Sequence, residues 1–137
     1  LKIFCGKPLI YWSIEACKKS KYISEIYVST DSKKIQFYAK KFKAKVPFTR
    51  PKKYSKDNSP EINAWFHMLR YFKDKKIDIQ NFVSVPATSP LRTAQDLDNM
   101  ISIFFKKKAN TVIGITDSHR NPYFNMVKKN KKIILKF

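Results

Sequence analysis

Hydrophobic and polar positions along the chain repeat with two periods, one typical of helices and one of short strands. Apolar side chains recur every three or four residues in four stretches, which predicts helices over residues 8–20, 32–42, 60–73 and 94–107. Short β-branched and aromatic runs between and after them predict strands over residues 25–30, 45–48, 81–85, 111–116, 125–129 and 133–137. This alternation indicates βαβ units. It predicts an α/β fold of three layers, with a mostly parallel sheet covered on both faces.

The pattern looks incomplete at both ends. The chain begins just before a helix that has no strand ahead of it, and it stops inside the strand predicted at 133–137. We therefore expect residues 1–137 to form a single incomplete domain.

Charge is the most unusual feature of the composition. The chain carries 29 Lys and Arg against 10 Asp and Glu, a formal net charge of +19. Only four of these cations are Arg, the side chain that reads bases and phosphates through two parallel hydrogen bonds. Lysine is scattered along every segment, which favours a compositional bias over a nucleic-acid surface. We expect no specific nucleic-acid partner. The alternatives from a different functional class are a basic nucleic-acid-binding module and a non-catalytic module that only dimerises.

Several classes of protein and site are excluded by what the chain contains. No apolar run approaches the roughly 20 residues that span a bilayer, and no signal-peptide pattern opens the chain, so we expect a cytoplasmic protein without a membrane partner. Cys5 and Cys17 are then free thiols, and with two histidines at unrelated spacing they predict no zinc site. The two glycines, Gly6 and Gly114, are too few for a P-loop or a G-x-G-x-x-G fingerprint within the chain.

Ligands of open α/β sheets bind in loops beyond the carboxyl ends of the strands, and the first two such loops here are polar. Asp31 directly follows a predicted strand; its carboxylate suits Mg²⁺ or a ribose hydroxyl, or it caps the next helix. In the second loop Arg50 precedes a proline, and Asp57, Asn58 and Ser59 stand at a helix entrance. That arrangement suits an anion or a base edge, or an ordinary N-cap by Asp57 or Ser59.

The third loop follows the strand predicted at 81–85. Pro86 and a second proline stiffen its backbone, Thr88 and Ser89 offer hydroxyl groups, and Arg92 offers a fixed positive charge. These groups suit a polyhydroxylated or carboxylate ligand. The alternative is that the loop only ends a strand and caps the next helix. Composition and spacing alone therefore reach an α/β domain with a polar ligand cleft.

Five sequence blocks, in order, resemble the acylneuraminate cytidylyltransferase family: GKPLIYWSIEACKKSKYI, IYVSTD, VPFTRPKKYSKDNSPEI, VPATSPLRTAQDLDNMI and TVIGITDSHRNPYFNMV. The TSPLR loop and the RP…D-x-S segment are the most specific of them, and the resemblance spans essentially the whole chain. It implies a nucleotide-diphospho-sugar transferase-like (Rossmann-like) fold. It also implies an enzyme that transfers CMP from CTP to a sialic-acid-like nine-carbon acidic sugar and releases pyrophosphate.

The resemblance places Arg50, Ser59 and Glu61 along the cytosine pocket and Pro86 at a sugar-contact position. Together with the loop chemistry above, the expected nucleotide-binding residues are Arg50, Asp57, Asn58, Ser59, Glu61 and Asp31. The expected sugar-binding residues are Pro86, Thr88, Ser89 and Arg92. Glu61 stands where the family often has Ser, and Pro86 stands where it often has a Gln that touches the sugar.

Two elements of the family fall outside the chain. The A-R-x-G-S-K-type loop that grips the triphosphate would lie just before Leu1, and the acidic magnesium motif and dimerisation segment would follow Phe137. The resemblance therefore implies Mg²⁺ and a homodimer for the whole enzyme, with catalytic residues and most metal ligands outside this fragment. The fragment alone is expected to be inactive. The alternative of the same class is an enzyme for 3-deoxy-octulosonate, against which TSPLR argues because those relatives typically carry an acidic residue there.

Overall fold

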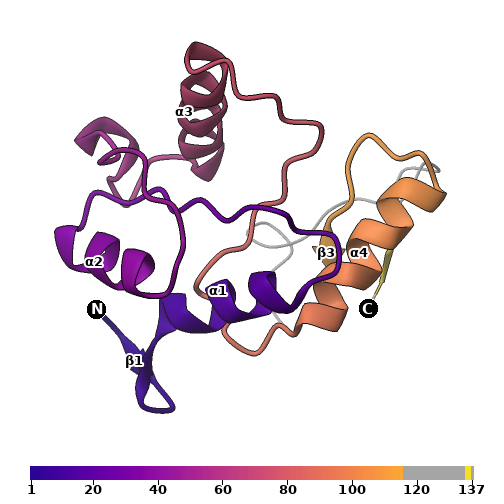
Figure 1. Cartoon of the computed structure of the whole chain (residues 1–137), viewed down its shortest axis with the longest axis horizontal. Helices are drawn as coiled ribbons and strands as arrows, with labels where there is room; N and C mark the ends of the chain where they lie inside the picture. The colour runs from indigo at the N-terminus through magenta and orange to yellow at the C-terminus, as the bar shows by residue number, and fades with distance from the viewer. Residues whose placement is uncertain (116–134, 137) are drawn as a thin grey trace.

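Helices account for most of the regular structure in the computed structural model, which describes residues 1–115 and 135–136 (Figure 1). The helices are α1 (Leu9–Lys19), α2 (Lys33–Lys41), α3 (Glu61–Asp74) and α4 (Ala94–Lys106), with a short 3₁₀ turn η1 (Lys52–Tyr54). All four helices predicted from the sequence are confirmed, with ends that differ by at most one residue. In this described part, no helix has the length and apolar character needed to cross a membrane.

The helix starts follow from local chemistry. The Ser32 hydroxyl accepts a hydrogen bond from the Ile35 amide at the start of α2. Thr93 and Asp96 form a reciprocal capping box at the start of α4. Helices α1 and α3 begin directly after prolines, whose fixed φ suits the entry to a helix.

A hairpin that the sequence pattern did not predict precedes α1. Strand β1 (Ile3–Phe4) pairs antiparallel with β2 (Lys7–Pro8). The two turn residues, Cys5 and Gly6, have φ values of 46° and 71°, as a two-residue type I′ turn requires. The Trp12 indole N–H donates to the Phe4 carbonyl at 3.0 Å, which fixes the hairpin against the first turns of α1.

The first two predicted strands meet in a parallel pair that is shorter than expected. Its one bridge joins Tyr27 and Lys45. Two backbone hydrogen bonds of 2.8 Å flank it, from the Val28 amide to the Lys45 carbonyl and from the Lys45 amide to the Ile26 carbonyl. The parallel direction agrees with the prediction, whereas the extent of the ladder does not.

A second parallel pair lies near the end of the chain. Strand β3 (Gly114–Ile115) pairs in parallel with β4 (Leu135–Lys136), at positions where strands were predicted. The strand predicted at 125–129 lies outside the described residues.

The strand predicted at 81–85 is not formed. It makes no ladder with any described residue, and Phe82 and Val83 are 42% and 43% exposed. A β-branched and aromatic run forms a strand only where partners lie alongside it, because the ladder supplies its hydrogen bonds. The α/β class with parallel pairing is therefore confirmed, but the described residues do not themselves build a three-layer sheet.

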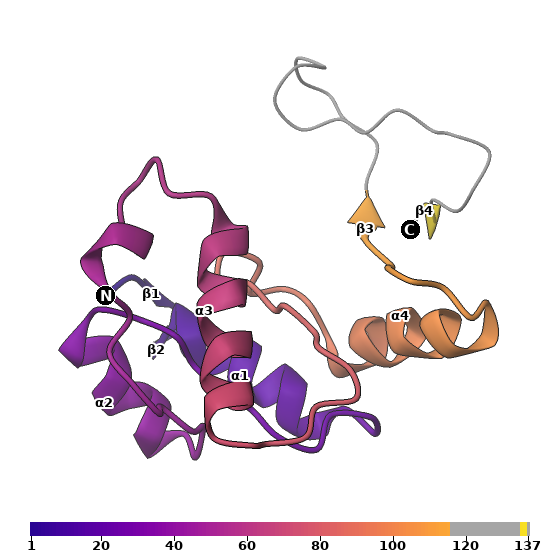
Figure 2. The same cartoon turned by 90° about the horizontal axis from the view of Figure 1, so that it is seen from above.

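The core is organised around α1, which lies between α2 and α4 (Figures 1 and 2). One cluster of buried side chains faces α2 and contains Ile14, Val28, Ala39 and Ala44. A second cluster faces α4 and contains Ala16, Cys17 and Leu97. Ile26 packs against both clusters, which makes them one continuous core.

A buried carboxylate ties α4 to the end of α1. Asp98, on α4, is 7% exposed and accepts hydrogen bonds from the Ser20 hydroxyl at 2.5 Å and the Lys21 amide at 3.1 Å. These groups follow the last turn of α1, so Asp98 fixes the angle at which the chain leaves that helix.

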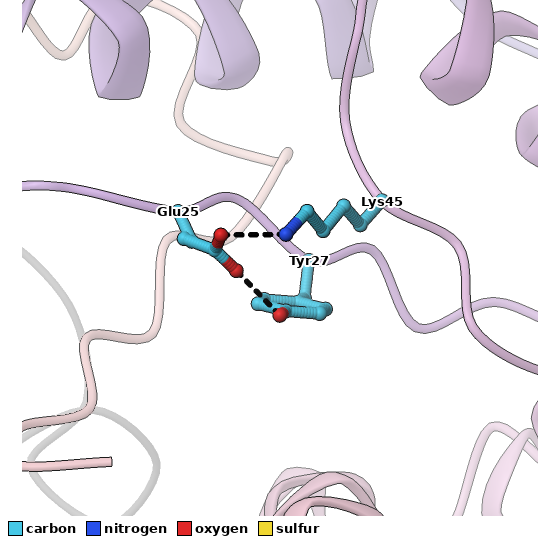
Figure 3. A network of polar contacts seen from close by, with 3 residues as sticks. All are labelled: Glu25, Tyr27 and Lys45. Atoms are coloured by element: carbon cyan, nitrogen blue, oxygen red, sulfur yellow. Dashed lines mark hydrogen bonds and ion pairs between the residues drawn. The ribbon is translucent and has the colours of Figure 1, made fainter. Parts of the chain in front are cut away.

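An exposed polar network closes the amino end of the first parallel pair (Figure 3). The Lys45 ammonium lies 2.5 Å from a Glu25 oxygen, and the Tyr27 hydroxyl donates to the other oxygen. The hydrogen bond from Lys45 is the main cause that lowers the pKa of Glu25, and the same bond raises the pKa of Lys45. The Tyr27 ring also packs edge-on against the Phe72 ring of α3, with 4.7 Å between the ring centroids. The network therefore connects the parallel pair to α3.

Candidate functional site

The first and second polar loops meet at the carboxyl end of the parallel pair. The Thr30 carbonyl accepts a hydrogen bond from the Arg50 amide at 3.0 Å. The Gln36 side-chain amide, from α2, donates to the same carbonyl at 3.3 Å and to the Thr49 hydroxyl at 2.9 Å. Asp31 and Arg50 therefore leave the pair from neighbouring positions, as expected for residues that follow adjacent parallel strands.

Asp31 is exposed and does not cap α2. The hydroxyl of Ser32 performs that role, so the capping alternative for Asp31 was wrong. The Ser32 amide in turn donates to the Thr30 hydroxyl at 3.2 Å, which fixes the backbone on both sides of Asp31. The Asp31 carboxylate forms no ion pair with any described residue, and it can therefore meet a ligand.

Arg50 folds back over its own loop. Its Nε donates to the Ser55 hydroxyl at 3.0 Å, and that hydroxyl donates to the Pro51 carbonyl at 3.2 Å. Within the described part of the chain its guanidinium pairs with no carboxylate. The loop thus orients the charge of Arg50 without neutralising it.

The rest of the second loop is a series of turns rather than a helix cap. Pro60 occupies the N-cap of α3 and no side chain caps that helix, so the capping alternative for Asp57 or Ser59 was wrong. The Ser59 hydroxyl instead donates to the Lys53 carbonyl at 2.9 Å. Asp57 and Asn58 are exposed at the tip of the loop.

Glu61 links the second loop to the segment that leads into the third. One of its carboxylate oxygens accepts hydrogen bonds from the Ser84 hydroxyl at 3.1 Å and from the Trp65 indole at 3.2 Å. The first residue of α3 thus holds residues 84–86 close to the loop of Arg50.

The third loop is fixed through the carbonyl of Pro86. This oxygen accepts hydrogen bonds from the Ser13 hydroxyl of α1 at 3.3 Å and from Arg92 Nη1 at 3.5 Å. Thr88 and Ser89 stay exposed on the loop surface. Arg92 therefore lies over the base of the loop, with the two hydroxyl residues presented outward.

Sequence reasoning missed the residues that hold these loops, Gln36, Thr49 and Ser13. Two of them carried a signal. Gln36 lies one helical turn after the capping Ser32 and so faces the same strand ends, and Ser13 is a polar residue that interrupts the apolar face of α1.

A groove of about 410 Å³ lies between η1 and α3, apart from the predicted residues, and is lined in part by Phe66, His67 and Arg70. The buried Nδ1 of His67 has no hydrogen-bond partner in the described part of the chain. Burial lowers the pKa of His67, and the positive charges of Arg70, Lys53 and Arg50 lower it further. His67 is therefore neutral near pH 7.

The described residues do not form a magnesium site. In residues 1–115 and 135–136, no three His, Cys, Asp or Glu side chains come together in a way that could hold a metal ion. Asp31 is a single carboxylate without a second acidic ligand beside it, and Mg²⁺ is usually held by one or two carboxylates together with substrate phosphates.

Comparison with known proteins identifies the family. A family model described as cytidylyltransferase matches residues 1–134. The chain belongs to this family. The result confirms the resemblance seen in the five sequence blocks, and the loops described above lie within the matched residues.

The names of individual relatives of this cytidylyltransferase chain refer to flagellin modification, to a legionaminic acid or to an octulosonate. It is 29% identical to post-translational flagellin modification protein B of Campylobacter coli, over 87% of the chain and 51% of that protein. It is 29% identical to CMP-N,N'-diacetyllegionaminic acid synthase of Legionella pneumophila, over 88% of the chain and 52% of that protein. It is 33% identical to 3-deoxy-manno-octulosonate cytidylyltransferase of Bdellovibrio bacteriovorus, over 72% of the chain and 36% of that protein. The chain thus spans about half the length of the first two relatives.

Proposed function

We propose that the chain is part of an enzyme that transfers CMP from CTP to a sialic-acid-like nine-carbon acidic sugar and releases pyrophosphate. The family match over residues 1–134 carries this proposal. The relative named as a CMP-N,N'-diacetyllegionaminic acid synthase supports the choice of sugar class.

The geometry at the carboxyl end of the parallel pair supports a division of labour between the loops. Asp31 and Arg50, which leave neighbouring hydrogen-bonded segments, serve the nucleotide, with Arg50 at the cytosine. Thr88 and Ser89 serve the sugar hydroxyls, and Arg92 faces the sugar carboxylate. In the proposed reaction the anomeric hydroxyl loses its proton to solvent and its oxygen forms a bond to the α-phosphorus. The bond from that phosphorus to pyrophosphate breaks, and pyrophosphate leaves with the bonding electron pair. Such transfers depend mainly on positioning and charge stabilisation.

A second sugar class has specific support. The match to a 3-deoxy-manno-octulosonate cytidylyltransferase at 33% identity makes that eight-carbon acid the alternative substrate. Both classes offer a carboxylate and several hydroxyls, so the polar groups of the third loop fit either of them.

We include Mg²⁺ in the proposal as the ion that offsets the negative charge of the phosphates. Its ligands would not be a cluster of side chains among the described residues. A chelator should therefore abolish turnover, and undiminished turnover in excess chelator would remove the metal from the proposal. A homodimer and a cytoplasmic location remain predictions that follow from the family.

We also propose that the complete protein forms the three-layer, mostly parallel sheet. Two observations support this: both pairs that join separate segments are parallel, and Ile26 and Val85 pack on the same cluster beside α1. A strand placed between residues 26–30 and 81–85 would give the latter the partners it lacks. Slow hydrogen exchange at the amides of Val83 and Val85 in the complete protein is expected, and exchange as fast as in a loop would exclude the sheet.

Pyrophosphate release by the full-length protein tests the function. We expect release from CTP with nine-carbon acidic sugars and little with 3-deoxy-octulosonate. Arg50→Ala should raise the KM for CTP about tenfold, because a charged hydrogen bond is lost. Arg70→Ala, at an exposed residue of α3 that lines the groove away from the predicted site residues, is the matched control and should leave KM unchanged. Turnover with the eight-carbon acid alone would select the alternative, and a folded protein inactive with every acidic sugar would overturn the proposal.

A further inference from the structure

The side chain of Gln36 joins the two chain segments from which Asp31 and Arg50 emerge. Its amide nitrogen donates at 3.3 Å to the Thr30 carbonyl and at 2.9 Å to the Thr49 hydroxyl. The Thr30 carbonyl also accepts from the Arg50 amide at 3.0 Å. One side-chain amide thus holds the last residue of one parallel segment and the residue just before Arg50.

This contact lies where the parallel ladder has ended. The bridge joins Tyr27 and Lys45, and the only further backbone bond toward the loops is the one from Arg50 to Thr30 among the described residues. Without Gln36, that single hydrogen bond would set the distance between the two loops. The helix that carries Gln36 is itself fixed by the Ser32 cap, so the amide projects from a rigid base.

The choice of a neutral amide has an electrostatic consequence. A Lys or Glu at this position would add a charge beside Asp31 and Arg50 and compete with a ligand for one of them. Gln donates both hydrogen bonds without adding charge. Asp31 and Arg50 therefore remain unpaired with any described carboxylate or cation.

We propose that Gln36 is a positioning residue for the nucleotide: by bridging Thr30 and Thr49 it fixes the backbone of Arg50 against Thr30, the residue before Asp31, in the geometry that receives CTP. The proposal rests on the proposed function, and it adds a residue that does not itself touch substrate.

Hydrogen exchange tests the positioning role without any need for activity. In the full-length protein, Gln36→Ala should speed exchange of the Arg50 amide about threefold to tenfold, because one of two ties between the segments is lost. Gln36→Glu keeps the size of the side chain but removes its N–H donors, so it should act as Gln36→Ala does. The matched control is Gln95→Ala, which removes a comparable 2.8 Å bond between Gln95 and Asn99 on the surface of α4.

Steady-state kinetics then test whether the geometry serves the nucleotide. Gln36→Ala and Thr49→Val should raise the KM for CTP about threefold to tenfold, with kcat and the KM for the sugar changed less than about twofold. Thr49→Ser retains the hydroxyl and should restore the parent KM. A merely structural role would lower stability without this selective change in one KM.

The outcomes separate the two proposals. Unchanged Arg50 exchange in Gln36→Ala, or a KM for CTP equal to that of Gln95→Ala, would overturn the positioning role even if the enzyme is active. If the unaltered protein releases no pyrophosphate with any acidic sugar, the proposed function fails. The exchange comparison then still decides whether Gln36 holds Arg50 in place.

Discussion

The two ends of the first parallel pair are stabilised in opposite ways. At the amino end, Glu25, Tyr27 and Lys45 bind one another, and their charges are satisfied within the protein (Figure 3). At the carboxyl end, neutral groups hold the backbone, while Asp31 and Arg50 form no ion pair with any described residue.

The difference indicates which end can bind a ligand. A carboxylate and an ammonium that already contact each other lose that interaction when either one binds something else. Charges that have no ionic partner within the described residues remain open to a charged substrate. Ligands of α/β proteins bind at the carboxyl ends of strands, and here the placement of unpaired charge agrees with that rule.

Truncating a core side chain of α1 that packs against the parallel pair should have the largest effect on stability. Ile14 of α1 is 2% exposed and packs with Val28 of the first segment of the pair and with Ala44, which leads into the second. Ile14→Ala should lower the free energy of unfolding by about 2–5 kcal/mol, since it leaves a cavity in the core. Chemical denaturation of the full-length protein measures this change. Ile3→Ala, at a residue 61% exposed on β1, is the matched control and should be nearly neutral. Equal stabilities of the two variants would show that the pair does not rest on α1.

The helices could be predicted from the sequence because their signals are local. Ser32 and Thr93 stand at helix starts where capping chemistry needs them, and the apolar periodicity of α1 and α4 matches their buried faces. The strands could be predicted less well, since a run such as 81–85 forms a strand only when a partner lies beside it. The hairpin turn at Cys5 and Gly6 was missed because one glycine inside a short run is a weak signal.

The site could be predicted only in part, for a related reason. The neighbourhood of Asp31 and Arg50 follows from parallel topology, so strand order alone predicts it. Glu61 and Gln36 make their contacts across 23 and 13 residues of sequence, to Ser84 and Thr49. Nothing local in the sequence encodes such long-range hydrogen bonds.

Protonation of His67, which lines the groove between η1 and α3, should lower the free energy of unfolding. Its pKa is below the usual 6.5, so the folded state binds a proton less readily than the unfolded chain does. The free energy of unfolding should therefore be constant above about pH 6.5 and fall as the pH drops below it. This loss of stability in acid should be smaller than the loss caused by Ile14→Ala. The variant His67→Gln should not show it. Denaturation curves recorded between pH 7 and pH 5 measure the change. If the free energy of unfolding of His67→Gln depended on pH as steeply as that of the parent, His67 would be excluded as the source.

The smallest effect is expected from the amino end. Glu25→Gln breaks an exposed ion pair, so the loss of stability should be slight and should diminish further in high salt. The pKa of Glu25 is lowered in the folded state, so its contribution is present above about pH 4.5 and is lost as the pH falls through the folded value. Parent and variant should therefore converge in acid. The KM for CTP should not change, because the substituted carboxylate lies at the end of the pair opposite Asp31 and Arg50. A rise in that KM as large as the one from Gln36→Ala would mean that the two ends are coupled, and unpaired charge would then no longer distinguish the binding end.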